Sequence, residues 1–410
     1  MTKDLEDVGT AAAELEVAPS ELGLWLRLAR ALETAGQAEQ AECAYAALGE
    51  AASDLGSVAL AVACAWWLAD NGHKDAAAKL VDQISSAHCR GSSRLDKKLR
   101  RPPVPPPAES GELGLPLGDA RTDPIAAANE AIALAVATAR KRKPAALAPT
   151  PLVSVLDAAE VEQLIGQMNA RWRGAGNVVV DVGQSADTLY WIARGKVVVT
   201  RGDHALGDLG SNAFFGEIAL LTGTTRTARV TCAQRCWLLE MPAAAVEKIA
   251  ARAPRLAKVL ANYARARLLA NVMRTSELFS RLTQDERREL LPKFETRFVQ
   301  EGETVVARGD ENSCLYVVAS GGCDVRDEDG SIASLTVGDA VGEMSLLKRQ
   351  PATADVVATD RSVLLALGRE QFDTVADKHP GLLAEVYKLL VTREKENRDA
   401  IVHDASDLII

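Results

Sequence analysis

The chain has 410 residues, enough for about three domains of ~150 residues each, and its 48% hydrophobic and 25% charged residues are typical of a soluble globular protein. A net charge of −9 argues against a general nucleic-acid-binding surface, which would need a basic face. No run of about 18 apolar residues predicts a membrane span, and the acidic start lacks the basic residues of a signal peptide, so we expect a cytoplasmic protein without a nucleic-acid or membrane partner.

Residues 1–89 have the apolar periodicity of helices. Trp25, Leu28, Ala29 and Leu32 fall on one helical face, and a second helix is predicted after the break at Gly36. The pattern recurs with a spacing of 36 residues, which pairs Gly36 with Gly72, Ala41 with Ala77 and Leu48 with Ile84. This spacing resembles two tetratricopeptide units, the second of them degenerate; a plain helical bundle is the alternative. Either form predicts contact with an unidentified protein partner, not chemistry.

Residues 90–149 are expected to form a basic, proline-rich linker. Prolines 102, 103 and 105–107 favour an extended, semi-rigid spacer. A helix is predicted near residues 124–143, with Asp123 as its cap, Pro124 in its first turn and a basic end before Pro144.

From Leu152 onward the chain repeats itself at a spacing of 126 residues. Among the matches, Leu152 recurs as Leu278, Arg171 as Arg297, Gly183 as Gly309, Leu189-Tyr190 as Leu315-Tyr316, and Gly216-Glu217 as Gly342-Glu343. Each copy has short β-branched segments separated by turns and ends in two helices, which favours a jelly-roll barrel. We therefore predict an α+β multidomain protein: a helical repeat (residues 1–89), the linker (90–149), two barrels (150–274 and 275–398) and a tail (399–410).

Residues 215–230 have the composition of an anion pocket. A glycine, Gly216, allows close approach of the backbone, and exposed N–H groups in such a turn bind phosphate. Arg226 adds a charge-assisted contact with matching geometry. Glu217 cannot serve a phosphate, so accepting a hydrogen bond from a sugar hydroxyl is its natural role. The pair predicts a clamp for a phosphorylated sugar.

This segment resembles the phosphate-binding cassette of the cyclic nucleotide-binding domain, the family of the catabolite activator protein and the protein kinase A regulatory subunit, and matches it without a gap. The resemblance implies that Glu217 binds the ribose 2′-OH and that Arg226 and the amides around Ala219 bind the cyclic phosphate. The implied site residues are Phe215, Gly216, Glu217, Ile218, Ala219, Arg226, Thr227 and Ala228. Arg229 stands where the family usually has a smaller residue, so it either adds a second cation or points outward.

The second cassette keeps the carboxylate but lacks the arginine. Gly342 and Glu343 are retained, but Ala352 takes the place of Arg226 and is followed by Thr353. Burying a phosphate without its cation costs on the order of several kcal/mol, which removes ordinary micromolar affinity. We therefore expect a degenerate second site in a structural or interaction module.

Three further details of the resemblance leave choices open. Thr227 matches a threonine that contacts guanine in guanosine-selective members, yet adenosine-binding members tolerate it, so cAMP and cGMP both remain candidates. Tyr263, on the helix after the first barrel, is a candidate to cap the base. Arg100-Arg101 ahead of the barrels is placed like the inhibitor segment of protein kinase A regulatory subunits, although Pro103 fits poorly and a solvated linker is the simpler interpretation.

The predicted function is that of a cyclic nucleotide (cAMP or cGMP) receptor, which passes its signal through hinge helices, the second barrel and the helical repeat to a protein partner. The alternative is a nucleotide-independent scaffold with vestigial domains. Seven scattered cysteines without a C-x-x-C and five scattered histidines form neither a metal site nor a nucleophile–base pair. We therefore expect no enzyme activity, no metal and no cofactor.

Overall fold

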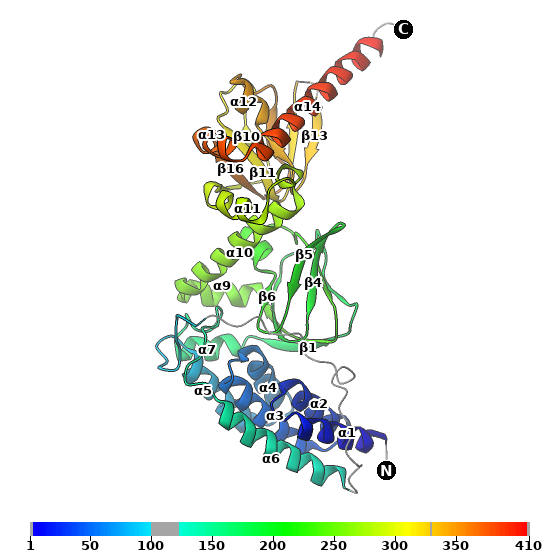
Figure 1. The fold of residues 1–410 in the computed structure, drawn as a ribbon, viewed down its shortest axis with the longest axis vertical. Coiled ribbons are helices and arrows are strands. Elements are labelled where there is room, and N and C mark those ends of the chain that lie inside the picture. The colour runs from blue at the N-terminus through cyan, green and yellow to red at the C-terminus, as the bar shows by residue number, and fades with distance from the viewer. Residues whose placement is uncertain (1–2, 100–122, 329, 408–410) are drawn as a thin grey trace.

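The computed structural model describes residues 3–99, 123–328 and 330–407, with side chains described as far as Arg393. Three parts follow one another along the long axis of the molecule: helices at one end, a first β-barrel in the middle (barrel A) and a second at the other end (barrel B) (Figure 1). The predicted fold class, helices followed by two β-sandwich domains with flanking helices, is confirmed. The Arg100-Arg101 segment and prolines 102–107 lie outside the described residues.

The amino-terminal helices are α1 (Lys3–Val17), α2 (Leu22–Thr34), α3 (Ala38–Asp54), α4 (Val58–Asp70) and α5 (Lys74–His88). Helices α4 and α5 each begin 36 residues after α2 and α3, respectively, which is the spacing of the sequence repeat. Gly36 and Gly72 end the first helix of each pair with φ angles of 71° and 91°, a conformation that glycine adopts without strain. The tetratricopeptide assignment itself stays a prediction.

Helix α6 (Pro124–Arg142) packs along α1 and α3. It begins where the sequence predicts, because the Asp123 carboxylate accepts hydrogen bonds from the amides of Ile125 and Ala126 at 2.9 and 3.2 Å. Asp54 at the end of α3 forms ion pairs with Arg94 (2.7 Å) and Lys143 (2.8 Å). This carboxylate therefore holds together the chain segments that precede and follow residues 100–122.

Each barrel consists of two four-stranded antiparallel sheets. Barrel A begins with α7 (Ala158–Ile165) and has the strands β1 (Asn169–Arg173), β2 (Val178–Val180), β3 (Thr188–Arg194), β4 (Val197–Arg201), β5 (His204–Leu209), β6 (Phe214–Phe215), β7 (Arg229–Cys232) and β8 (Cys236–Pro242). They form the sheets β1-β8-β3-β6 and β2-β7-β4-β5. Helix α8 (Glu217–Thr222) lies within the cassette, and α9 (Ala243–Arg252) and α10 (Pro254–Thr275) follow the barrel.

Barrel B repeats this topology with the sheets β9-β16-β11-β14 and β10-β15-β12-β13. Its strands are β9 (Glu295–Val299), β10 (Thr304–Val306), β11 (Cys314–Ser320), β12 (Cys323–Arg326), β13 (Ser331–Leu335), β14 (Ala340–Val341), β15 (Asp355–Ala358) and β16 (Ser362–Gly368). Its helices are η1 (Glu277–Phe279), α11 (Gln284–Leu290), η2 (Leu291–Lys293), α12 (Glu343–Lys348), α13 (Arg369–Lys378) and α14 (Pro380–Asp407), which extends away from the barrel (Figure 1).

The outer face of one sheet of barrel A is covered by the amino-terminal helices. Trp191 and Trp237 of this sheet are buried in the same hydrophobic core as helices α1–α6. Trp237 stacks on Trp172 with 5.1 Å between ring centroids, and the ring of Tyr45 in α3 approaches its edge at 6.1 Å. The inner face of the sheet contributes instead to a separate core inside the barrel. The helical part and barrel A are therefore packed as one unit.

A single asparagine fixes the position of α4 against this sheet. Asn212 has a φ of 67°, which asparagine tolerates better than most residues. Its side-chain oxygen accepts a hydrogen bond from the amide of Ala59 at 3.1 Å, and its carbonyl accepts one from the indole of Trp191 at 3.0 Å. Asn212 thus caps the start of α4 from the neighbouring barrel.

Helix α10 connects the two barrels and contributes to a hydrophobic core at each end. Leu256 and Leu260 in its first half lie in the core shared by barrel A and the helices. Leu268, Val272 and neighbouring residues of its second half lie in the core of barrel B. In the described parts of the chain no helix combines the length and apolar character of a membrane span.

We predict that Trp172→Ala lowers the stability of the helical part and barrel A by about 2 kcal/mol, because half-buried aromatic area is lost from the shared core. Trp172 also lies under the guanidinium of Arg30, 4.3 Å from the ring centroid. The matched control is Phe298→Ala, 126 residues later in barrel B, whose side chain is 58% exposed and should contribute less than about 0.5 kcal/mol. Scanning calorimetry checks the difference; equal shifts in the unfolding midpoints would contradict the shared core.

Candidate functional site

The first cassette forms a tight turn between β6 and α8. Gly216 begins α8 with a φ of 93°, and a Cβ at this position would lie 2.7 Å from Nη1 of Arg226 and 3.0 Å from the carbonyl oxygen of Thr188. Only glycine therefore fits here, both for its backbone conformation and for its close neighbours. This turn places the Glu217 side chain and the Arg226 guanidinium beside the same space.

That space is a cavity of about 360 Å³ between the cassette, the wall of barrel A and helix α10. All eight residues that the sequence analysis assigns to the site line it, and so do residues of β5 and α10. The lining consists of Val180, Val199, Leu206, Gly207, Asp208, Leu209, Phe215, Gly216, Glu217, Ile218, Ala219, Arg226, Thr227, Ala228, Val230, Arg267, Ala270, Asn271 and Arg274. The structure thus brings the predicted residues together; their role in binding stays a prediction.

Arg226 is a buried cation held by neutral groups. Its side chain is 4% exposed, Nη1 donates to the carbonyl of Gly216 at 2.9 Å, and Nη2 donates to the carbonyl of Thr188 at 2.6 Å. The nearest ion-pair partner, the exposed carboxylate of Asp187, is 4.0 Å away. Burial lowers the pKa of Arg226, but a guanidinium remains charged at neutral pH. A buried cation without a close carboxylate carries an uncompensated charge, which is costly in a protein interior.

Glu217 is fully buried and bound to a residue that the sequence analysis missed. Arg267 of α10 donates from Nη1 to Glu217 Oε1 at 2.7 Å and to the carbonyl of Phe214 at 2.6 Å. Burial raises the pKa of Glu217, and the nearby Arg267 opposes this shift. The signal for Arg267 was available in the sequence, because Arg393 stands 126 residues later and pairs with Glu343 in the same way at 2.8 Å.

Two residues considered in the sequence analysis lie outside the cavity lining. Arg229 points outward and forms a 2.8 Å ion pair with Asp181, so it is not a second cation in the pocket. Tyr263 is 39% exposed and its ring packs on Phe214 at 5.0 Å between centroids. The structure does not place this tyrosine over the site.

In barrel B the place of the guanidinium is taken by another residue. Ala352 is buried in the core of barrel B, and Thr353 is exposed. Asn312 donates from Nδ2 to the carbonyl of Cys314 at 2.8 Å, and Cys314 is the counterpart of Thr188 in the repeat. A Cβ at Gly342, which has a φ of 94°, would lie 2.6 Å from that Nδ2. Asn312 therefore replaces one of the two backbone hydrogen bonds of Arg226, without its charge.

The second cassette is also fixed more firmly to its own barrel. Arg369 donates to the carbonyls of Leu346 and Ser345 at the end of α12, at 2.7 and 3.3 Å. The equivalent residue after barrel A is Ala243, which has no such side chain. Glu343 Oε1 is enclosed without a described hydrogen-bond partner. Barrel B has thus kept a buried carboxylate at this position.

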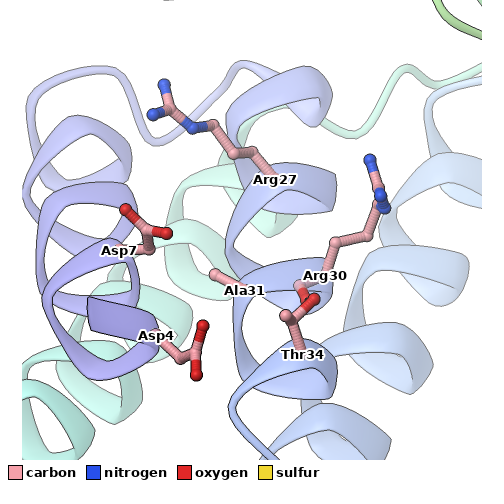
Figure 2. A pocket seen from close by; sticks show the side chains of 6 residues that line it. All are labelled: Asp4, Asp7, Arg27, Arg30, Ala31 and Thr34. Carbon is pink, nitrogen blue, oxygen red and sulfur yellow. The ribbon is translucent and has the colours of Figure 1, made fainter. Parts of the chain in front are cut away.

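Another hollow, of about 250 Å³, lies between α1 and α2. Figure 2 shows Asp4 and Asp7 on α1 beside Arg27, Arg30 and Thr34 on α2, with the Arg30 side chain pointing away from the two aspartates. Arg27 is paired with Glu14 at 2.6 Å, and Arg30 lies over Trp172. The arginines of this hollow therefore already have partners within the fold. Among the described residues no group of three or more His, Cys, Asp or Glu could hold a metal ion.

We predict that Asn312 and residue 352 are energetically coupled. Asn312→Ala should destabilise barrel B by about 1–2 kcal/mol, because a buried carbonyl loses its donor, and Ala352→Arg should destabilise it by about 1–3 kcal/mol through overpacking. The double variant should recover part of this loss, since the guanidinium can occupy the vacated place. A double-mutant cycle by urea unfolding measures the coupling; purely additive effects would contradict the replacement.

Comparison with known proteins agrees with this duplicated architecture. The family described as cyclic nucleotide-binding domain matches residues 171–253 and 296–379. A cAMP-dependent protein kinase regulatory subunit of Candida albicans is 26% identical over 240 residues, 58% of this chain and 49% of that protein. The cGMP-dependent protein kinase 2 of Rattus norvegicus is 24% identical over 256 residues, 60% of this chain and 32% of that protein.

Among solved structures, the regulatory subunit of a cAMP-independent protein kinase A from Trypanosoma brucei is 22% identical, with a TM-score of 0.28. The match covers 58% of this chain and 85% of the solved chain. The chain spans about half or less of the length of the curated relatives named above. The family matches fall on the two barrels, each with its own glycine–glutamate turn. Each barrel therefore contains a segment that matches the cyclic nucleotide-binding domain, and the two segments follow one another in tandem.

Proposed function

We propose that the protein is a non-catalytic receptor that binds a cyclic nucleotide, cAMP or cGMP, in barrel A and passes the signal to a protein partner. The observation that carries this proposal is the buried Arg226 at the wall of a cavity, with neutral carbonyls as its hydrogen-bond acceptors. The regulatory subunits among the relatives support a regulatory role; a cytoplasmic location is part of the same proposal. The domain boundaries at residues 89, 149, 274 and 398 and the tetratricopeptide-like repeat belong to the same proposal.

In this proposal the cyclic phosphate and the ribose of the ligand contact different residues. The cyclic phosphate lies against Arg226, whose charge-assisted hydrogen bonds are stronger than those of a neutral donor, and beside the backbone of Ala219. The ribose 2′-OH donates to Glu217. Because a carboxylate offers about four acceptor positions, Glu217 can accept this bond while Arg267 holds Oε1.

Barrel B is proposed to bind no cyclic nucleotide. A phosphate entering beside Gly342 would meet the uncharged amide of Asn312 and the methyl group of Ala352 instead of a guanidinium. Desolvating the phosphate without a cation costs several kcal/mol. The second barrel therefore acts as a structural partner of the first.

The first cassette touches barrel B directly, which offers a route for the signal. Thr224 Oγ1 lies 2.7 Å from Ser320 Oγ and 2.7 Å from Thr222 Oγ1, and all three residues are buried. A Cβ at Gly223 would collide with the guanidinium of Arg361. Ile218 packs against the core of barrel B. A shift of the cassette on binding would thus be felt by the second barrel.

The protein partner is proposed to be reached through α10, barrel B or the helical part. One face of the helical part is already occupied, because it covers barrel A. Its other faces remain for a partner. The names of the relatives suggest a protein kinase as the class of partner to test first.

We predict that Arg226→Ala weakens cyclic nucleotide binding by at least ~100-fold, because a buried phosphate loses its cation, a loss of roughly 3–5 kcal/mol. The matched control is Arg229→Ala, which removes an exposed arginine three residues away that is paired with Asp181 and should leave affinity within about twofold. Isothermal titration calorimetry with cAMP and cGMP measures both variants.

Circular dichroism of the Arg226→Ala variant shows whether the barrel remains folded. If the wild-type protein binds neither nucleotide, the receptor proposal is wrong, and the nucleotide-independent scaffold becomes the better explanation. Equal binding by wild type and a folded Arg226→Ala variant would also contradict the assignment of the phosphate site.

We predict that Thr224→Val uncouples the barrels without abolishing binding, because it removes the hydroxyl bonded to Ser320 while keeping the shape of the side chain. Hydrogen exchange in β11 and β12 should respond to nucleotide in the wild-type protein and much less in this variant. Thr225→Val, at an exposed neighbouring position, is the control and should keep the response. An unchanged response in Thr224→Val would argue against this route.

A further inference from the structure

Helix α10 forms one complete wall of the cavity in barrel A. Arg267, Ala270, Asn271 and Arg274 lie on successive turns of one face and line the cavity. Arg267 marks the sugar end, because it is paired with Glu217 at 2.7 Å. Arg274, seven residues later, lies about 10 Å farther along the helix axis. That separation is comparable to the distance from a ribose to the far edge of its purine base.

The structure makes specific room for Arg274 at this far end. Its Nη1 donates to the carbonyl of Leu206 in β5, which orients the guanidinium beside the cavity. The next residue, Gly207, has a φ of 137°, and a Cβ there would come within 3.3 Å of that Nη1. A side chain at residue 207 would therefore crowd the guanidinium, and glycine leaves the space open.

An arginine discriminates between purines because it can only donate hydrogen bonds. The O6 and N7 atoms of guanine are both acceptors and match the guanidinium fork, whereas adenine presents N7 beside an amino group that is itself a donor. Thr227 and Asn271, which also line the cavity, each carry donor and acceptor capacity and can adapt to either base. Asp208 of β5 also lines the cavity, but its carboxylate is paired with Lys196 at 2.6 Å. Arg274 therefore supplies the donor-only group at this end that separates the two bases.

We propose that Arg274 is the specificity-determining residue of barrel A and that it makes the site select cGMP over cAMP. The inference rests on the proposed function, since it assumes that a cyclic nucleotide occupies this cavity. It goes beyond that function by assigning the base and the residue that recognises it. A good pair of hydrogen bonds between a guanidinium and guanine discriminates by roughly 1–3 kcal/mol, which corresponds to about a 5- to 150-fold preference.

The test is calorimetric titration of the full-length protein with cGMP, cAMP and 7-deaza-cGMP, which lacks the N7 acceptor. We expect wild type to bind cGMP at least ~5-fold more tightly than cAMP and to bind 7-deaza-cGMP more weakly than cGMP. Arg274→Ala should lose both preferences while its affinity for cAMP stays within about twofold. Arg255→Ala, an exposed arginine at the start of the same helix and outside the cavity lining, should behave as wild type.

The outcomes separate this inference from the proposed function. The role of Arg274 would be overturned if wild type bound cAMP more tightly than cGMP, or if Arg274→Ala kept the wild-type preference for cGMP. Either result would leave the receptor function standing. Failure of every nucleotide to bind wild type would overturn both. Because the comparison of cGMP with 7-deaza-cGMP uses the unaltered protein, it stays decisive even if Arg274→Ala fails to fold.

Discussion

The organisation of barrel A depends on burying one guanidinium among uncharged acceptors. The carbonyls of Gly216 and Thr188 satisfy the N–H groups of Arg226 but do not neutralise its charge. Such an arrangement is costly in a protein interior unless an anion completes it. The glycine turn, the cassette helix and the nearby carboxylate of Glu217 surround this cation, so it lies where the proposed ligand would bind.

Barrel B shows how the same fold persists when that cation is removed. Asn312 donates to the counterpart of the carbonyl that Arg226 binds, Arg369 holds the end of the cassette helix, and Ala352 joins the core. The ion pair Glu343–Arg393 is retained although barrel B lacks the arginine of the phosphate site. This retention indicates that the carboxylate and the helix arginine contribute to joining each barrel to its closing helix, independently of a ligand.

Much of this could be predicted from the sequence because the duplication repeats at a fixed spacing of 126 residues. The strands, the glycine turn and the loss of the arginine at residue 352 follow from that pattern. Pairing between distant segments did not follow. Arg267 recurs as Arg393 in the helices that close the two barrels, but the spacing alone does not show that these arginines pair with Glu217 and Glu343. Asn312 lies outside the cassette, and the contact of Thr224 with Ser320 joins residues 96 positions apart. The docking of the helices on the tryptophans of barrel A depends on tertiary packing, which periodicity does not specify.

Helix α10 has one half embedded with barrel A and the other with barrel B. Its 22 residues give a length of about 33 Å at 1.5 Å per residue. If the helix moves as a rigid lever, a tilt of about 10° at the Glu217–Arg267 contact displaces Thr275, which lies about 12 Å farther along the helix axis toward barrel B, by roughly 2 Å. A sub-ångström rearrangement around a small ligand can in this way become a displacement of a whole domain.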